Sequence, residues 1–228
     1  SFKKLAFTRS PETGLPATYT GTDEVDTLIL ADQPSDITIS GLDAADVIVV
    51  SAQALAANAL SNYKVYGNAG NDQIQINAAQ LSNSTVQGGA GNDGITFFAN
   101  ANAATSVIRG GADNDTIFVA SLNGSTVNGN AGNDTLTISA TGFGTSTAFG
   151  GAGNDSISAA AATVGTTLSG DLGNDQVTGS GGADTIFNTG GNDTVNAGAG
   201  NDSINASTGI NILNGQANND TVTGGNQA

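Results

Sequence analysis

A short acidic turn motif recurs along the chain and constrains its fold more than any other feature. The tripeptide Gly-Asn-Asp occurs seven times, and looser copies end at Asp115, Asp184 and Asp220. The fullest copy, residues 88–96, reads Gly-Gly-x-Gly-x-Asp-x-aliphatic-x, a unit of nine residues. Self-similarity at a fixed short period is typical of chains that stack one structural unit along an axis. The sequence therefore predicts a repeat architecture.

The spacing of the motif shows how many turns make one unit. Six nonapeptides follow one another without a gap from Gly170 to Thr223, with Asn211 where the fifth copy should carry Asp. Upstream, the motif aspartates are 19 to 22 residues apart, which is two nonapeptides plus a few residues. One coil therefore contains two turns and two strands. We call the turns that carry Asp72 and its equivalents the first side, and the opposite turns the second side.

Aliphatic residues fill a fixed slot two residues after each turn. All but Ala148 of the 17 slots hold Val, Ile or Leu. The slots after first-side turns are Ile74, Ile95, Ile117, Leu136, Ile157, Val177, Val195 and Leu213. Those after second-side turns are Val65, Val86, Ile108, Val127, Ala148, Leu168, Ile186, Ile204 and Val222. Because side chains alternate along a strand, stacked coils would bury these residues as continuous columns. The pattern predicts an all-β fold, a parallel β-roll or β-solenoid of about ten coils.

The domain organisation follows from where the repeat is complete. We expect a non-repeat segment at residues 1–20, degenerate first coils at 21–64 and the regular solenoid at 65–228. An Ala-rich stretch at 51–60 interrupts the period and is interpreted as a short helix or bulging loop. The Ser/Thr/Ala/Asn loops of the second side are interpreted as ordinary surface.

Composition excludes several classes of function. The chain has no Cys or His, so disulfides, thiolate chemistry and imidazole-dependent catalysis are excluded. Its formal charge of −15 would repel a phosphate backbone, so we expect no nucleic-acid partner. No run of about 18 apolar residues is present, so we expect no membrane insertion. Three of the five basic residues, Lys3, Lys4 and Arg9, lie near the N-terminus and could contact an anionic surface; a solvated tail is the alternative.

The turns carry the ligand chemistry of a hard divalent cation. Calcium takes 6–8 oxygen ligands, commonly carboxylates and backbone carbonyls. Stacking would place one Asp of each turn about 4.8 Å from the next. Such a column of like charges opposes the stack unless a cation lies between the levels. The alternative for any single Asp is a turn-forming role, since Asp and Asn favour turns. Ten aspartates in register favour calcium.

The nonapeptide resembles the RTX, or haemolysin-type, calcium-binding repeat, over residues 65–224 and more weakly over 21–50. The resemblance implies that each ion lies between two turns of the same side, which gives about eight slots. Six first-side slots join successive aspartates from Asp72 to Asp193, and two second-side slots join Asp184, Asp202 and Asp220. The implied metal ligands are the aspartates Asp72, Asp93, Asp115, Asp134, Asp155, Asp175, Asp184, Asp193, Asp202 and Asp220. The turn glycines assigned with them are Gly70, Gly88, Gly91, Gly132, Gly150, Gly153, Gly173, Gly182, Gly191 and Gly200.

Several turns depart from the family pattern. Asp113, Asp171 and Asn218 replace turn glycines, and Asn211 is expected to weaken a site above Asp193. The turns of Asp26 and Asp46 lack the inner glycine, which argues against calcium there.

The expected function is structural. No nucleophile or base accompanies the repeat, so we expect no enzyme. We expect a calcium-stabilised assembly protein at an extracellular location, such as a cell-surface layer, sheath, filament or virion exterior. The chain would self-associate through solenoid ends or faces into an oligomer or filament. The alternative is an RTX folding or secretion module of a larger toxin, hydrolase or adhesin, although no secretion segment follows the repeats. An ice- or glycan-binding module would need outward threonine or asparagine rows, and the turns show no regular threonine ladder.

Overall fold

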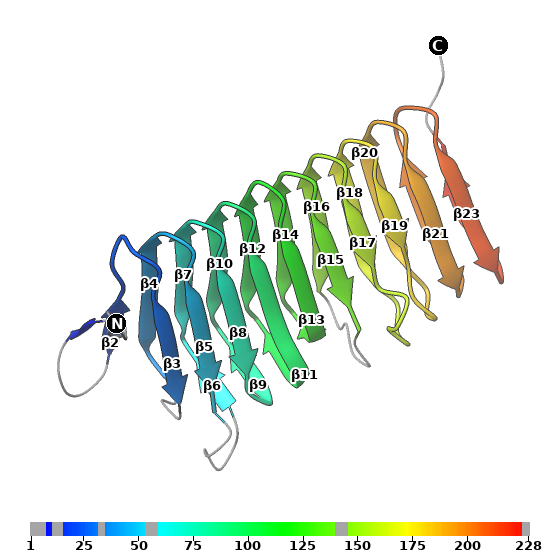
Figure 1. The fold of residues 1–228 in the computed structure, drawn as a ribbon. Helices are drawn as coiled ribbons and strands as arrows, with labels where there is room; N and C mark the ends of the chain where they lie inside the picture. Colours follow the sequence, from blue (N-terminus) through cyan, green and yellow to red (C-terminus); the bar gives the residue numbers. More distant parts are fainter. Residues whose placement is uncertain (1–7, 11–15, 32–34, 53–58, 140–145, 225–228) are drawn as a thin grey trace.

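The computed structural model describes residues 8–10, 16–31, 35–52, 59–139 and 146–224. These residues form one elongated parallel β-solenoid in which the chain alternates between two facing sheets (Figure 1). The described residues contain no helix, and so none that could cross a membrane. The prediction of an all-β parallel solenoid is confirmed.

The first sheet has twelve strands, and each pairs with the next strand of the same sheet. They are β1 (Thr8–Ser10), β2 (Ala17–Thr20), β4 (Ile37–Asp43), β7 (Lys64–Ala69), β10 (Thr85–Ala90), β12 (Val107–Ala112), β14 (Thr126–Ala131), β16 (Thr147–Ala152), β18 (Thr167–Leu172), β20 (Thr185–Gly190), β22 (Ser203–Ala206) and β24 (Thr221–Thr223). All neighbours are parallel except β1 and β2, which pair antiparallel. Parallel pairing thus already begins with β2, inside the segment 1–20 that we predicted to be outside the repeat.

The second sheet also has twelve strands, ten of them in one parallel series. That series is β3 (Thr27–Ala31), β5 (Val47–Ser51), β8 (Gln73–Asn77), β11 (Gly94–Ala104), β13 (Thr116–Asn123), β15 (Thr135–Ile138), β17 (Ser156–Ser158), β19 (Gln176–Thr178), β21 (Thr194–Ala199) and β23 (Ile212–Ala217). The short strands β6 (Ala59–Ser61) and β9 (Gln80–Ser82) pair with each other, and β9 also pairs with β11.

The aliphatic slots form the core in the predicted register. In the first sheet Val65 pairs with Val86, and Val86 with Ile108. In the second sheet Ile74 pairs with Ile95 in the same way. All of these side chains are buried. Each coil therefore covers the apolar residues of its neighbours, as a solenoid requires.

The outward face of the first sheet carries a row of threonines. Successive coils pair Thr126, Thr147, Thr167 and Thr185 along this face. The prediction from the sequence concerned only the turns, which carry no regular row of threonines. The molecule does have a threonine ladder, and it lies on the sheet. The slot is recognisable in the sequence as the residue before each second-side aliphatic.

Two predicted features lie largely outside the described residues. Residues 53–58 of the Ala-rich segment are not described, so the helix or loop predicted there stays a prediction. Lys3 and Lys4 also lie outside, and Arg9 is described only as part of the backbone of β1.

Candidate metal centre

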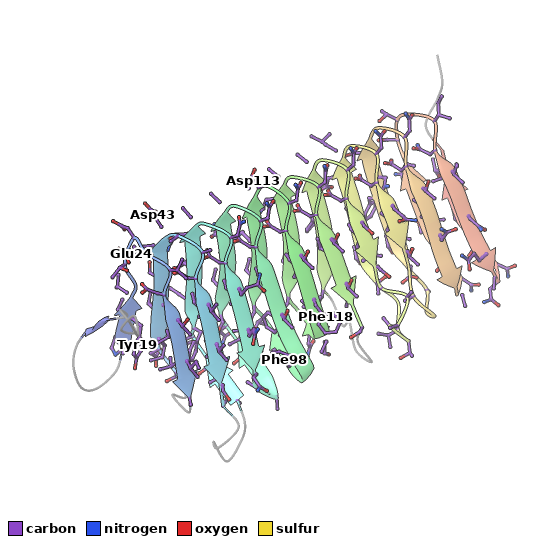
Figure 2. All side chains as sticks on the ribbon, viewed as in Figure 1. Tyr19, Glu24, Asp43, Phe98, Asp113 and Phe118 are labelled. Carbon is purple, nitrogen blue, oxygen red and sulfur yellow. The ribbon has the colours of Figure 1, made fainter. Side chains whose placement is uncertain are left out.

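The first-side turns connect the first sheet to the second and place one carboxylate at every level. Each aspartate is the last residue before a second-sheet strand, and its side chain points into the solenoid. Asp46 and Asp72 have no exposed surface, and Asp93 retains 3 %. In contrast, Asp43 and Asp113 are exposed on the same row of turns (Figure 2). The sequence motif therefore selects the buried acid of each turn.

One oxygen of each buried carboxylate bonds to the neighbouring coil. The backbone N–H of Asp72 donates to Oδ1 of Asp93 at 2.8 Å, and the N–H of Asp93 donates to Oδ1 of Asp115 at 2.8 Å. The same bond recurs at every level from Asp26 to Asn211, and we call this series the aspartate ladder. The ladder fixes the height of each carboxylate relative to the next coil.

The other carboxylate oxygen has no hydrogen-bond donor. Among the described residues, nine buried aspartates have an Oδ2 atom that accepts no hydrogen bond. They are Asp46, Asp72, Asp93, Asp115, Asp134, Asp155, Asp175, Asp193 and Asp202. A buried, unpaired carboxylate oxygen is costly, and it requires either a proton or a cation. Eight of these nine belong to the aspartate ladder.

For the ladder aspartates up to Asp175, the glycine five residues earlier makes room for this second oxygen; Asn188 holds that position before Asp193. A Cβ atom at Gly88 would collide with Oδ2 of Asp93, and one at Gly129 with Oδ2 of Asp134. The carbonyl oxygen of the equivalent glycine in the next coil approaches the same point, at 2.5 Å from a Cβ built on Gly129. At Gly41, Gly67, Gly129 and Gly150, carboxylate and carbonyl oxygens thus approach the same point, and both are ligands that calcium prefers.

Burial raises the pKa values of several ladder aspartates, and at some of them the charge of neighbouring aspartates adds to this shift. Burial, together with the charge of neighbouring aspartates, raises the pKa of Asp93 to about 7 and that of Asp115 to about 8. The pKa of Asp175 rises to about 7 for the same reasons. Without a cation, therefore, the folded chain favours protonated carboxyls at these levels.

The donor set fits calcium shared between levels better than a compact acidic cage. Nowhere in the described residues do three or more acidic side chains gather around one point. Each level supplies one carboxylate, so an ion would be held by aspartates of successive turns and by glycine carbonyls. Calcium would supply the positive charge that the unpaired Oδ2 atoms lack, and would link the coils across the turn.

On the second side, the residue at the position of the ladder aspartate changes along the solenoid. This change was not predicted from the sequence. The position equivalent to the ladder aspartate holds Tyr63 in an early coil, then four serines and Thr166, and then Asp184, Asp202 and Asp220. Ser84, Ser106, Ser125 and Ser146 are buried. The N–H of Ser106 donates to Oγ of Ser125 at 2.9 Å, and the N–H of Ser125 donates to Oγ of Ser146 at 3.0 Å.

These serines correct the interpretation of the second-side loops as ordinary surface. The hydroxyls form a neutral version of the aspartate ladder, because a hydroxyl can accept the same backbone bond without a charge. Each serine lies two residues before an aliphatic slot, as each ladder aspartate does. This common position is the sequence signal that could have found them.

The predicted second-side aspartates differ from one another. Asp202 is buried and its Oδ2 has no donor among the described residues. Asp220 lies in the last described coil, where it is partly exposed. Asp184 is buried and accepts four hydrogen bonds from two residues, Thr166 and Ser180.

The family comparison agrees with the geometry of these turns. A family model for the RTX calcium-binding nonapeptide repeat matches residues 64–75, 81–96, 99–125, 123–137, 141–162, 165–195 and 196–228, more than half of the chain. No curated protein matches the chain. The matched segments begin at residue 64, so the coils of Asp26 and Asp46 lie outside them.

Proposed function

The chain belongs to the family of RTX calcium-binding nonapeptide repeats, and from this premise we propose that it is a calcium-stabilised structural protein of an extracellular surface. The observation that supports this most is the first-side column of buried aspartates with unpaired oxygens, from Asp46 to Asp193. Calcium at these turns would offset the repulsion between levels and lock the coils together. The role of the metal is structural in this proposal, and the chain is not an enzyme.

The proposed location follows from the strength expected of such sites. Extracellular calcium modules bind with dissociation constants of about 10⁻⁴–10⁻³ M, which suits calcium concentrations outside a cell. A ligand that binds only the folded state stabilises it by about 2.7 kcal/mol per site at 100 times its dissociation constant. Several sites in one solenoid would make folding depend steeply on calcium. RTX repeats are also typical of secreted proteins.

The proposed partner is a second copy of this chain. A solenoid has an unpaired strand edge at each sheet where its last coil is uncovered, and such edges pair readily with further strands. In the described part of the chain, β23 and β24 are the last strands of their sheets. Val222 on β24 is 47 % exposed, although Ile204, its equivalent one coil earlier, is buried.

Circular dichroism with and without a calcium chelator tests the calcium-dependent fold. We expect β-structure in millimolar calcium and a largely disordered chain in EGTA, restored when calcium is added back. Magnesium at the same concentration is the control, because its smaller, strictly octahedral shell suits these turns less well. Identical spectra in calcium and in EGTA would contradict the proposal.

The alternative role is a folding or secretion module of a larger secreted protein. The family match supports it equally, because the match describes the repeat and not a complete protein. The full reading frame distinguishes the two: a catalytic or toxin domain beside the repeats favours the module.

A further inference from the structure

Two backbone arrangements recur among the aspartate turns, and we call them open and closed. In the open state, the residue two before the aspartate has a positive φ and its N–H donates to the next coil. Gly70 and Gly91 show this arrangement, with φ of 122° and 114° and bonds to Ala90 O and Ala112 O at 2.8 and 3.2 Å. In the closed state, the corresponding N–H turns back onto a hydroxyl of its own turn. Open turns leave Oδ2 without a donor, and closed turns satisfy it.

The turn of Asp46 is open, although Leu42 and Ala44 stand where the motif has its two inner glycines. Ala44 takes φ of 117°, and its N–H donates to Ala69 O of the next coil at 2.7 Å. Leu42 also lies at positive φ, at 80°. Positive φ is costly for residues with a Cβ atom, so these two residues hold a strained conformation. At the cost of this strain, the Asp46 turn has the same open arrangement as the turns that contain the inner glycines.

The carboxylate of Asp46 then has the environment of the ladder sites downstream. The side chain has no exposed surface, and its Oδ2 accepts no hydrogen bond from any described residue. Gly41 leaves room for it, because a Cβ there would collide with Oδ2 and lie 2.6 Å from Gly67 O. Oδ1 of Asp46 accepts the ladder bond from the N–H of Asp26 at 2.8 Å.

The turn of Asp26 is closed and ends the ladder. Its Oδ2 accepts the N–H of Thr22 at 2.6 Å and the hydroxyl of Thr22 at 3.0 Å. The N–H of Glu24 donates to the Thr22 hydroxyl at 3.3 Å, within the same turn. This carboxylate has donors in place of a cation.

The turn of Asp184 is closed as well, although its sequence fits the motif better. The N–H of Ser180 donates to Oδ2 at 2.7 Å, and the hydroxyl of Ser180 donates to Oδ1 at 2.8 Å. The N–H of Gly182 donates to the Ser180 hydroxyl at 3.1 Å instead of to the next coil. Thr166 donates two further bonds to Oδ1, at 2.6 and 2.7 Å.

We propose that calcium is bound at the Asp46 turn, one coil upstream of the matched repeat, and that the Asp184 turn binds none. The assignment rests on the proposed function, in which calcium occupies the open turns. It reverses the expectation from the motif, which favoured Asp184 and argued against Asp46. The two aspartates in closed turns are each the first residue of an acidic series. Asp26 begins the aspartate ladder of the first side, and Asp184 begins the series Asp184, Asp202 and Asp220 of the second side.

Native mass spectrometry of the full chain in saturating calcium tests the assignment by counting bound ions. We compare Asp46→Asn with Asp26→Asn and Asp184→Asn, and circular dichroism verifies that each variant is folded. Asparagine keeps the ladder acceptor, as Asn211 does when it accepts the N–H of Asp193 at 2.8 Å. We expect Asp46→Asn to bind one ion fewer than the wild type, and the other two variants to bind the wild-type number.

An unchanged ion count for Asp46→Asn, or one ion fewer for Asp184→Asn, overturns the assignment while leaving the proposed function intact. A wild-type chain that binds no calcium removes the proposed function, and the assignment with it.

A second pair of variants keeps the test valid if Asp46→Asn fails to fold. Ala44→Gly relieves the strain of an open turn and should raise the melting temperature in calcium. Ala45→Gly, at an exposed neighbour without positive φ, should lower it or leave it unchanged. A lower melting temperature for Ala44→Gly contradicts the open state.

Discussion

A single carboxylate in this molecule carries out two tasks with its two oxygens. From Asp46 to Asp193, Oδ1 of each ladder aspartate accepts a backbone bond from the preceding coil, and Oδ2 stays buried without a donor. The first task needs only an acceptor, which explains why Asn211 and the second-side serines can perform it. The second task needs a negative charge, and it distinguishes the aspartate positions from all others. Asp is suitable because its short side chain reaches the bond without leaving the turn.

The raised pKa values predict an inverted pH dependence for the calcium-free chain. Asp93, Asp115 and Asp175 have pKa values of about 7 to about 8 in the folded state, against about 3.9 in an unfolded chain. Between these values the folded state holds more protons than the unfolded state, so stability falls as the pH rises. In chelator we expect the folded fraction, measured by circular dichroism, to decrease from about pH 4.5 to about pH 8, where the chain becomes largely disordered.

Calcium should abolish this trend, because carboxylates that hold an ion are deprotonated in the folded chain, as they already are in the unfolded chain above about pH 5. In saturating calcium, the free energy of unfolding measured with urea should therefore change little from about pH 5 to about pH 8. The triple variant Asp93→Asn, Asp115→Asn, Asp175→Asn is the control, and its folded fraction in chelator should vary less with pH. A calcium-free chain that becomes more stable toward high pH would contradict the assignment of these pKa shifts.

The two sheets differ in the inward-facing residue that follows the aliphatic slot along each strand. In the first sheet the next inward residue is the glycine that accommodates a carboxylate, such as Gly88 or Gly129. In the second sheet it is a second apolar residue in the early coils, such as Ile76 or Phe97, and small residues in later ones, such as Ala197. The early coils therefore bury more apolar surface, and the later coils carry aspartates on both sides.

The buried second-side serines form a serine ladder (Ser84, Ser106, Ser125 and Ser146), which predicts a stability contribution that does not involve calcium. Oγ of Ser125 accepts the N–H of Ser106 at 2.9 Å and donates to Ala103 O at 2.9 Å. Ser125→Ala leaves a buried N–H unpaired, which should cost about 1–3 kcal/mol. Urea unfolding in saturating calcium measures this cost.

The matched control is Ser158→Ala, on the outward row of β17. We expect it to change stability by less than about 0.5 kcal/mol. Equal effects of the two substitutions would show that the buried hydroxyls contribute nothing specific. The calcium concentration at half-folding should shift with Ser125→Ala only as far as the lost stability requires.

At the scale of the whole molecule, each coil is held by its neighbours and by little else. Strand pairing, aliphatic columns and the two polar ladders all connect successive coils. The two rows of turns that carry the ladders lie along opposite edges of the stack (Figure 1). A coil with only one neighbour keeps half of these contacts. The exposure of Val222 in the last described coil is the direct consequence.

Self-association through this coil predicts a difference between two lysine substitutions on β24. Val222 belongs to the inward column, so Val222→Lys would place a charge in the contact with a further coil. Thr221→Lys, on the exposed outward face of the same strand, is the control. Sedimentation velocity in calcium should show assemblies for the wild type and for Thr221→Lys, and mainly monomers for Val222→Lys. A monomeric wild type at high protein and calcium concentration would contradict self-association.

The sequence alone determined the fold of this protein. The period of nine, the aliphatic slots and the turn glycines predicted two parallel sheets and the residues of their core, because each coil repeats the same local rule. Ile74, Ile95 and Ile117 occupy one column, as predicted from their distance to the turns. The motif also predicted which acids lie on the turns and that calcium is their ligand.

Only the tertiary structure decided the state of each carboxylate. Whether Oδ2 is paired depends on the φ angles of the turn and on which neighbour its N–H groups meet, and neither follows from the motif. Asp46 and Asp184 exchanged their expected environments for this reason. The serine ladder was likewise invisible, because its bonds form between residues 19 and 21 positions apart that meet only when the coils stack.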